Sequence, residues 1–248
     1  MPAMNISTKL KLYARNLLYP GIDLHTRDRA SLCRFWKAGA RDVLDAGSGN
    51  GYFSWLAYQS GARVVAMNFE ASQVEKAREF LVGYRKADPA RLSFEQRNLY
   101  DLVQEERRFD EIICYEVLEH LRRDEMVVQE FYRLLRPGGV LHLCCPYRLH
   151  PRHQAEVLDT RETGGHVRPG YTEADYHKLL KPVGFHIDRV VGIGPKSVYL
   201  ADEFLRVIRN QLGDAIALLF MPLALPLMRV GGRSPDVPFS IYVRAVKS

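Results

Sequence analysis

The stretch that most constrains the fold is VLDAGSGNGYF, residues 43–53. An apolar run ends in Asp45, and Gly47, Gly49 and Gly51 then alternate with small polar residues. Glycines in a tight turn between a strand and a helix let the backbone approach a ligand closely. The helix N-terminus also offers free N–H groups. The segment therefore predicts an α/β sheet with a ligand site at the end of its first strand.

The rest of the chain alternates short apolar runs with helical patterns, which is typical of a parallel sheet covered on both faces. The helical patterns lie near residues 53–60, 71–87, 124–135 and 171–185, and a long polar loop is predicted at residues 150–170. Thr172 and Asp175 have the spacing of a helix capping box, with a shorter acid in place of the usual Glu or Gln. We divide the chain into an N-terminal helical cap (1–40), a core (41–191), an apolar helical insertion (192–239) and a last strand (240–248). The strands are predicted at residues 41–45, 63–67, 92–97, 109–115, 140–146, 186–191 and 240–246.

Composition narrows the function only slightly. The chain has 248 residues, a net charge of +6 and scattered basic residues, and it contains no nucleic-acid recognition motif. We therefore expect no nucleic-acid partner. Its four cysteines lack the spacing of a zinc site, so no metal is expected. The N-terminus has no cleavable signal pattern, which predicts a cytoplasmic protein.

The glycine spacing argues against a dinucleotide. A G-x-G-x-x-G loop would need a third glycine where this chain has Tyr52. Asp45 at the strand end can instead receive an ammonium group or order the loop by hydrogen bonds. A ligand with a cationic amino-acid part suits this loop better than a diphosphate does.

Three segments resemble, in order and rough spacing, the class I S-adenosylmethionine-dependent methyltransferases. They are VLDAGSGNG (43–51), FDEIICYEVLEHL (109–121) and LLRPGGVLHLCCP (134–146). The resemblance covers about residues 41–191 and the last strand. It implies a Rossmann-like, doubly wound, mostly parallel seven-stranded sheet with helices on both faces. It also implies S-adenosyl-L-methionine as the cofactor.

The same resemblance implies the residues that contact the cofactor. Asp45 and the glycine loop would hold the methionyl part and the ribose. The family usually ends its second strand with an acid for the ribose hydroxyls, but this chain has Asn68 there and Glu70 two residues on. Either can serve. Asn98 has an alternative role as a helix cap, and Tyr115 as a core residue. The full set is Asp45, Gly47, Ser48, Gly49, Gly51, Asn68, Phe69, Glu70, Asn98, Leu99, Tyr115 and Glu116.

Methylation of a hydroxyl requires removal of its proton, which a histidine does well near neutral pH. His120 follows the fourth predicted strand, and His150, His153 and His166 follow the fifth. Each of them has a structural or solvated alternative. The catalytic candidates are His166 first, then His150 and His120.

The segment after the fourth strand reads CYEV, whereas enzymes that methylate exocyclic base amines carry an Asp/Asn-Pro-Pro-aromatic run there. We therefore expect O-methylation of a small-molecule, glycan or lipid-linked acceptor. Two other classes remain open. One is an NAD(P)-dependent oxidoreductase, and the other is a catalytically inactive methyltransferase-fold binding protein, which the departure at Asn68 permits.

The insertion contains the apolar stretch AIALLFMPLALPLMRV, residues 215–230, interrupted by Pro222 and Pro226. It is too short and too broken to span a membrane comfortably. It is either a buried or dimer-forming element or a surface that contacts a membrane or a lipid. In the second case, we expect the protein at the inner face of the membrane. Ile6, Leu10, Tyr13 and Leu17 share one face of an N-terminal helix with basic residues around it. The oligomeric state is left open.

Overall fold

The computed structural model describes residues 16, 19–21, 23–228 and 237–248. The predicted amphipathic helix with Ile6, Leu10, Tyr13 and Leu17 lies outside these residues, as do the last two positions of the apolar stretch 215–230.

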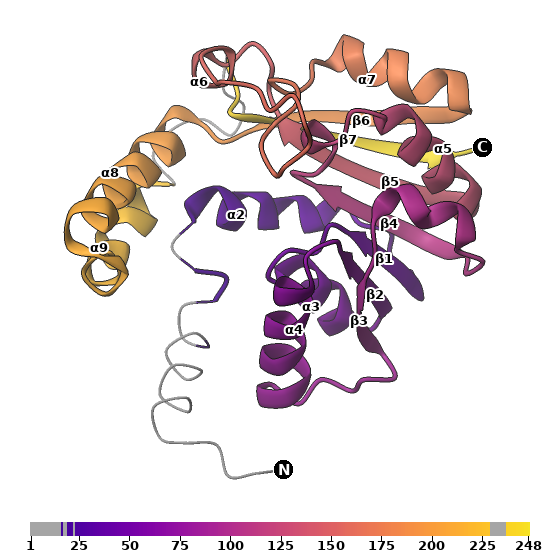
Figure 1. The fold of residues 1–248 in the computed structure, drawn as a ribbon, viewed down its shortest axis with the longest axis horizontal. Helices are drawn as coiled ribbons and strands as arrows, with labels where there is room; N and C mark the ends of the chain where they lie inside the picture. Colours follow the sequence, from indigo (N-terminus) through magenta and orange to yellow (C-terminus); the bar gives the residue numbers. More distant parts are fainter. Residues whose placement is uncertain (1–15, 17–18, 22, 229–236) are drawn as a thin grey trace.

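Seven strands form one sheet in the order β3-β2-β1-β4-β5-β7-β6 (Figure 1). The pairs β1–β2, β1–β4, β2–β3 and β4–β5 are parallel, whereas β7 is antiparallel to both β5 and β6. Only β7 therefore runs against the others, which confirms the mostly parallel seven-stranded sheet. The strands are β1 (Asp42–Ala46), β2 (Arg63–Asn68), β3 (Leu92–Gln96), β4 (Phe109–Tyr115), β5 (Leu135–Pro146), β6 (Phe185–Ile193) and β7 (Ser240–Lys247).

Helices cover both faces because the core strands are apolar on both sides. Val43 packs with the helices of one face, and its neighbour Leu44 packs with those of the other. The first face carries α3 (Tyr52–Gln59), α4 (Ala71–Arg78) and the π-helical turn η2 (Glu79–Tyr84). The second carries η3 (Leu99–Gln104), α5 (Asp124–Leu134), α7 (Glu173–Leu180) and the turn η5 (Lys181–Val183).

Two local predictions have different outcomes. The capping box at Thr172 and Asp175 is confirmed: the Thr172 side chain accepts from the Asp175 amide, and the Asp175 side chain accepts from the Thr172 amide. The predicted start of the fifth strand at residue 140 is wrong, because β5 already begins at Leu135. Leu135 pairs with Phe109, and a register shift separates this pair from the regular ladder that starts at Glu111.

The predicted polar loop after β5 contains a short helix, α6 (Pro151–Gln154). Beyond it, Asp159 organises the loop by accepting hydrogen bonds from the Arg161 and Thr163 amides, at 2.8 and 2.5 Å. The Val167 amide donates to the Glu119 carbonyl at 2.8 Å, which ties the loop to η4 (Leu118–His120). The loop is thus built into the carboxyl edge of the sheet.

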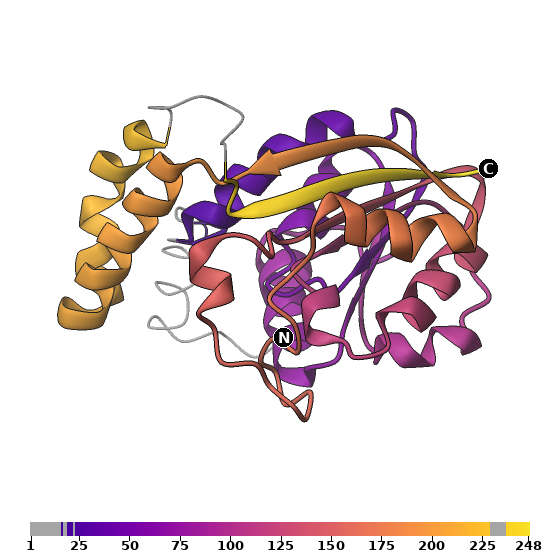
Figure 2. The same ribbon diagram turned by 90° about the horizontal axis from the view of Figure 1, so that it is seen from above.

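Two further segments complete the fold. The helix α2 (Leu24–Arg29) lies at the carboxyl edge, and η1 (Ala30–Phe35) packs on the first face of the sheet through Leu32. The insertion forms α8 (Lys196–Leu212) and α9 (Asp214–Leu227) beyond that edge (Figures 1 and 2). Leu24 packs with α8 and α9 in a small core of their own, made of Leu24, Val198, Ala201, Leu205, Met221 and Ala224.

The prolines that interrupt the apolar stretch of the insertion do not end its helix. α9 runs through Pro222 and Pro226, and both residues are exposed, so their rings face away from the small core. Among the described residues, no helix combines the length and the apolar character needed to cross a membrane.

Candidate active site

A cavity of about 350 Å³ lies at the carboxyl ends of β1, β2, β3 and β4. This size is within the range that small ligands occupy, roughly 300–1,000 Å³. Open α/β sheets bind ligands at this edge. The predicted site residues that line it are Gly47, Gly49, Asn68, Phe69, Glu70, Asn98, Leu99, Glu116 and His120.

The glycines after β1 have different tasks. A Cβ on Gly47 would lie 2.2 Å from Val117 Cγ2, so this glycine permits the loops after β1 and β4 to pack together. A Cβ on Gly49 would meet nothing within 4 Å, although its φ of +51° also favours glycine. Gly49 therefore presents bare backbone to the cavity. Gly51 is needed for packing, because its Cβ would lie 2.8 Å from Leu81 Cδ1.

Asp45 and Ser48 lie buried at the glycine loop and do not line the cavity. Ser54 Oγ, on α3, donates to Asp45 Oδ2 at 2.5 Å. Burial raises the pKa of Asp45 to about 6, although the Ser54 hydrogen bond opposes this shift. The Ser48 hydroxyl is buried without a hydrogen-bond partner among the described residues. The loop thus holds one unused hydroxyl and one readily protonated carboxyl.

Two asparagines end neighbouring strands in the same way. The Asn68 Oδ1 accepts from the Glu70 amide at 2.9 Å, and the Asn98 Oδ1 accepts from the Tyr100 amide at 3.0 Å. Asn98 is therefore a helix cap and also lines the cavity. In both, the amide nitrogen is the group that can donate to a ligand. Asn68 and Glu70 both line the cavity, so the choice between them stays open.

Tyr115 and Glu116, at the end of β4, lie in different environments. Tyr115 is a core residue: its ring packs edge-on against Phe53, and its hydroxyl accepts from Trp36 Nε1 at 3.2 Å. Glu116 lines the cavity in a left-handed conformation with φ of +55°. Such strain in a non-glycine residue is concentrated at functional sites. Arg29, from α2, lies 3.4 Å from its carboxylate.

The three catalytic candidates lie at two different places. His120 lines the cavity, and its ring centroid is 4.7 Å from that of His166. His120 Nδ1 lies 3.0 Å from the Gly165 carbonyl, and His166 Nδ1 lies 2.8 Å from Glu156 Oε2. Burial lowers the pKa of His120.

His150 does not line the cavity. It caps α6 by accepting from the Arg152 amide at 3.3 Å, and its ring packs against Tyr199 and Phe239. His153 is held nearby, with Nε2 3.0 Å from the Phe239 carbonyl. The structure therefore brings His120 and His166 together and places His150 in a separate aromatic cluster.

Sequence reasoning missed Glu119, which is fully buried next to His120. Neither carboxylate oxygen has a hydrogen-bond partner of good geometry among the described residues, although the Cys145 thiol lies close. Burial, and then the charge of Glu116, raise the pKa of Glu119 well above its ordinary value. The signal for Glu119 in the sequence was its position directly before His120, which is a candidate residue.

Glu162 and Arg29 were also missed, because they reach the site over long sequence separations. Tyr100 Oη donates to Glu162 Oε1 at 2.7 Å, and the Arg122 amide donates to the same carboxylate. Glu162 and Gly164 line the cavity, so the loop after β5 forms part of its wall. No local pattern indicates such a contact.

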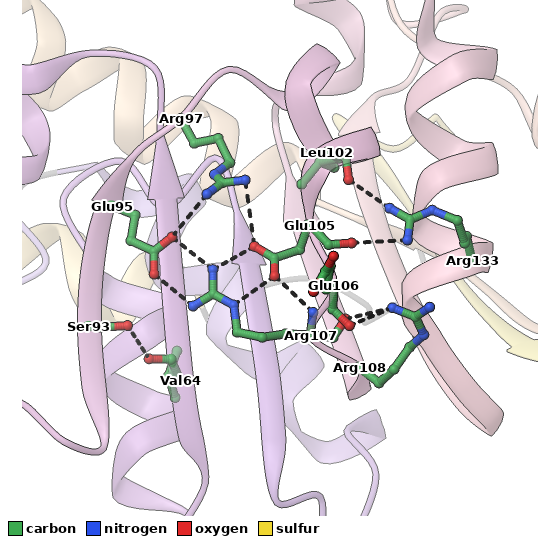
Figure 3. Close-up of polar contacts among 10 residues, drawn as sticks. All are labelled: Val64, Ser93, Glu95, Arg97, Leu102, Glu105, Glu106, Arg107, Arg108 and Arg133. Carbon is green, nitrogen blue, oxygen red and sulfur yellow. Dashed lines mark hydrogen bonds and ion pairs between the residues drawn. The ribbon is translucent and has the colours of Figure 1, made fainter.

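An ion-pair network fixes the segment that carries Asn98 (Figure 3). Arg107 makes two hydrogen bonds to Glu95, at 2.7 and 2.9 Å, and its Nε donates to Glu105 at 2.8 Å. Arg97 lies 3.7 Å from Glu105, and Arg133 donates to the Glu105 carbonyl at 3.0 Å. The turn between β3 and β4 is therefore anchored at both ends. This anchoring holds Asn98 and Leu99 at the cavity.

These features fit a ligand with a cationic amino-acid part and a nucleoside. Gly49 offers open backbone, and the two asparagines offer donors at neighbouring strand ends. Asp45 and Glu116 supply carboxyl groups close to the loop.

Part of the chain is similar in sequence to known proteins. Residues 44–143 match a family model described as a methyltransferase domain. A probable S-adenosylmethionine-dependent methyltransferase of Mycolicibacterium smegmatis is 29% identical over 157 residues, which cover 63% of this chain and 56% of that protein. A ubiquinone biosynthesis O-methyltransferase of Xanthomonas oryzae is 36% identical over 107 residues, 43% of each chain. The chain thus spans about half the length of these curated relatives.

Solved structures agree on the fold. The O-methyltransferase from a trans-AT polyketide synthase multienzyme of Brevibacillus brevis, in complex with S-adenosyl-L-homocysteine, superposes with a TM-score of 0.63 at 17% identity. The match covers 100% of this chain and 81% of that chain.

Proposed function

Because the chain carries a class I S-adenosylmethionine-dependent methyltransferase domain, with S-adenosyl-L-methionine as its cofactor, we propose that it methylates a hydroxyl oxygen. The acceptor is a small molecule, a glycan or a lipid-linked metabolite, and the lipid-linked class is favoured. The observation that carries this proposal is His120 in the wall of the cavity, with the His166 imidazole packed against it.

The cofactor, when bound, supplies a methyl group on a sulfonium, which is already a good leaving group. The chain has to hold the cofactor, align the acceptor and remove the hydroxyl proton. Gly49, Asn68 or Glu70, and Asn98 hold the cofactor. His120 and His166 are the proposed bases, and the Nδ1 of each ring is held by an oxygen of the chain. The opposite nitrogen of each ring is thereby kept as a base.

Two observations favour an apolar acceptor. Several curated relatives are named ubiquinone biosynthesis O-methyltransferases, a name that indicates oxygen methylation in the making of a lipid quinone. In addition, the pair α8–α9 lies beyond the carboxyl edge of the sheet with apolar side chains exposed, among them Phe204, Leu219 and Leu223. This pair suits contact with a membrane or a lipid tail.

The test is methyl transfer from cofactor labelled in its methyl group to phenols with and without an alkyl chain, with matched anilines as amine controls. We expect label on the phenol oxygen and a preference for the alkylated phenol. His120→Asn should lower the rate by about 10²-fold or more, as expected for loss of a general base. His177→Asn is the matched control, since His177 lies exposed on α7, 3.8 Å from Glu173.

Label on amines alone would contradict O-methylation. Binding of NADH but not of S-adenosylhomocysteine would favour the oxidoreductase alternative. Tight S-adenosylhomocysteine binding without turnover on any acceptor would favour a non-catalytic binding protein.

A further inference from the structure

Three side chains with metal-binding groups converge beside the cofactor cavity. One ligand atom each of Glu119, His120 and His166 lies within 4.8 Å of the others. Glu119 Oε1 and His120 Nε2 are 3.9 Å apart. Two ligands of one zinc-like ion, each about 2.0–2.2 Å from it, lie about 3–4 Å apart. This spacing therefore needs only small side-chain rotations to close around an ion.

The two imidazoles are oriented as metal ligands usually are. His120 Nδ1 faces the Gly165 carbonyl at 3.0 Å, and His166 Nδ1 faces the Glu156 carboxylate at 2.8 Å. Both partners accept hydrogen bonds, so each Nδ1 carries the proton and each Nε2 keeps its lone pair. Metal-binding histidines are typically held in this way, by a carbonyl or a carboxylate on the other nitrogen.

Glu119 provides an independent sign of a missing partner. Its side chain is 0% exposed, and both of its oxygens lack a hydrogen-bond partner of good geometry among the described residues. An unsatisfied buried carboxyl is costly unless it is paired or coordinates a metal. The nearby cation Arg29 does not fill this role, because its guanidinium lies 3.4 Å from Glu116.

We propose that Glu119, His120 and His166 bind one divalent transition-metal ion such as Zn²⁺ at the wall of the cofactor cavity. Two histidines and one glutamate are a ligand set of catalytic zinc sites, in which a fourth position stays open. Because His120 lines the cavity, that open position faces the acceptor side.

The ion also gives the site a way to activate the acceptor. A hydroxyl that coordinates the open position releases its proton to solvent and stays bound as the oxyanion, with no change in oxidation state. With the ion bound, His120 and His166 serve as ligands, and the ion takes over the activation that the imidazoles provide as bases in its absence. This role rests on the proposed function, whereas binding of the ion does not.

Cobalt is the probe, because Co²⁺ in such a site absorbs visible light without any turnover. Full-length protein is stripped with EDTA, freed of the chelator and titrated with CoCl₂ in the absence of acceptor. We expect one equivalent to bind, to give a visible band and to be displaced by ZnCl₂. Glu119→Gln and His166→Asn should each weaken binding about 100-fold or more. Glu156→Gln should weaken it about 10–100-fold, as for outer partners of ligands. His177→Asn should leave it unchanged.

S-adenosylhomocysteine binding, measured by calorimetry, shows that each variant is folded. Retained nucleoside binding with a lost cobalt band supports the site. A wild-type protein that binds no cobalt, or variants that bind it as tightly as the wild type, would overturn it. Cobalt binding without methyl transfer would contradict only the proposed function. Methyl transfer without ion binding would contradict only the metal site.

Discussion

At the scale of single residues, substitutions at Gly47 and Gly49 distinguish a glycine needed for packing from one needed for the approach of a ligand. Gly47→Ala should destabilise the fold by about 2–4 kcal/mol, since its Cβ would lie 2.2 Å from Val117 Cγ2 in a left-handed turn. Gly49→Ala meets no protein atom within 4 Å and should cost only about 1–2 kcal/mol.

The loss of affinity should rank in the opposite order to the loss of stability. Gly47→Ala should lower the stability more, whereas Gly49→Ala should lower the affinity for S-adenosylhomocysteine more. Gly49→Ala should weaken S-adenosylhomocysteine at least tenfold, because its methyl group occupies space that faces the cavity. Denaturant unfolding and calorimetry on both variants check this. If Gly49→Ala binds the nucleoside like the wild type, the ligand does not approach the loop here.

Asp45 should link cofactor binding to pH. Burial raises its pKa to about 6, so the folded protein favours the neutral acid, and this stabilising contribution is lost as the pH rises through about 6. A cationic amino group needs the carboxylate, so affinity for S-adenosylhomocysteine should fall as the pH drops below about 6.

Asp45→Asn is the control for that titration. It keeps the size of the side chain and removes the charge. The variant should bind about tenfold more weakly at pH 7.5, with no pH dependence near 6, and it should be at least as stable as the wild type there. Calorimetry between pH 5 and 8 decides the matter. An unchanged pH profile in the variant would exclude Asp45 as the source.

At the scale of elements, Glu105 should stabilise the turn between β3 and β4. Its side chain is 5% exposed, and its hydrogen bonds with Arg107 hold its pKa at about 2. Glu105→Gln should cost about 1–3 kcal/mol at pH 7, whereas exposed Glu106→Gln should stay within about 0.5 kcal/mol.

The difference should depend on pH in one direction. A lowered pKa means that the ionised form contributes stability above the ordinary value of 4.5, and that this contribution is lost as the pH falls toward 2. The gap between wild type and Glu105→Gln in urea unfolding should therefore close between pH 4.5 and 2. A constant gap would assign the loss to packing.

The elements themselves were largely predictable, because apolar runs and helix caps are local signals. Six of the seven strands begin within about two residues of their predicted starts, and the cap at Thr172 was read correctly. The early start of β5 was not, since it depends on the pairing of Leu135 with Phe109. For the site, too, only local signals were visible in the sequence. The glycine loop was visible in one stretch, whereas the contacts of Arg29 with Glu116 and of Glu162 with Tyr100 join distant segments.

At the scale of the whole molecule, α8 and α9 lie beyond the carboxyl edge of the sheet (Figure 2), and they expose apolar side chains there. Leu219 and Leu223 are 75% and 64% exposed, respectively. The small core with Leu24 ties this surface to α2, whose Arg29 reaches Glu116 in the cavity wall. A membrane that covered α8–α9 would therefore lie on the side of the molecule that carries the cavity.

This arrangement predicts sedimentation with vesicles of phosphatidylglycerol and phosphatidylcholine. Burying a leucine contributes about 1.5–3 kcal/mol, so the double change Leu219→Glu and Leu223→Glu should weaken vesicle binding more than tenfold. Val103→Glu is the matched control, because Val103 is 63% exposed on η3. Nucleoside affinity should not change in any variant. A wild-type dimer in light scattering that the same double change dissociates would identify the surface as a contact between copies of the chain, and the lipid assignment would then be wrong.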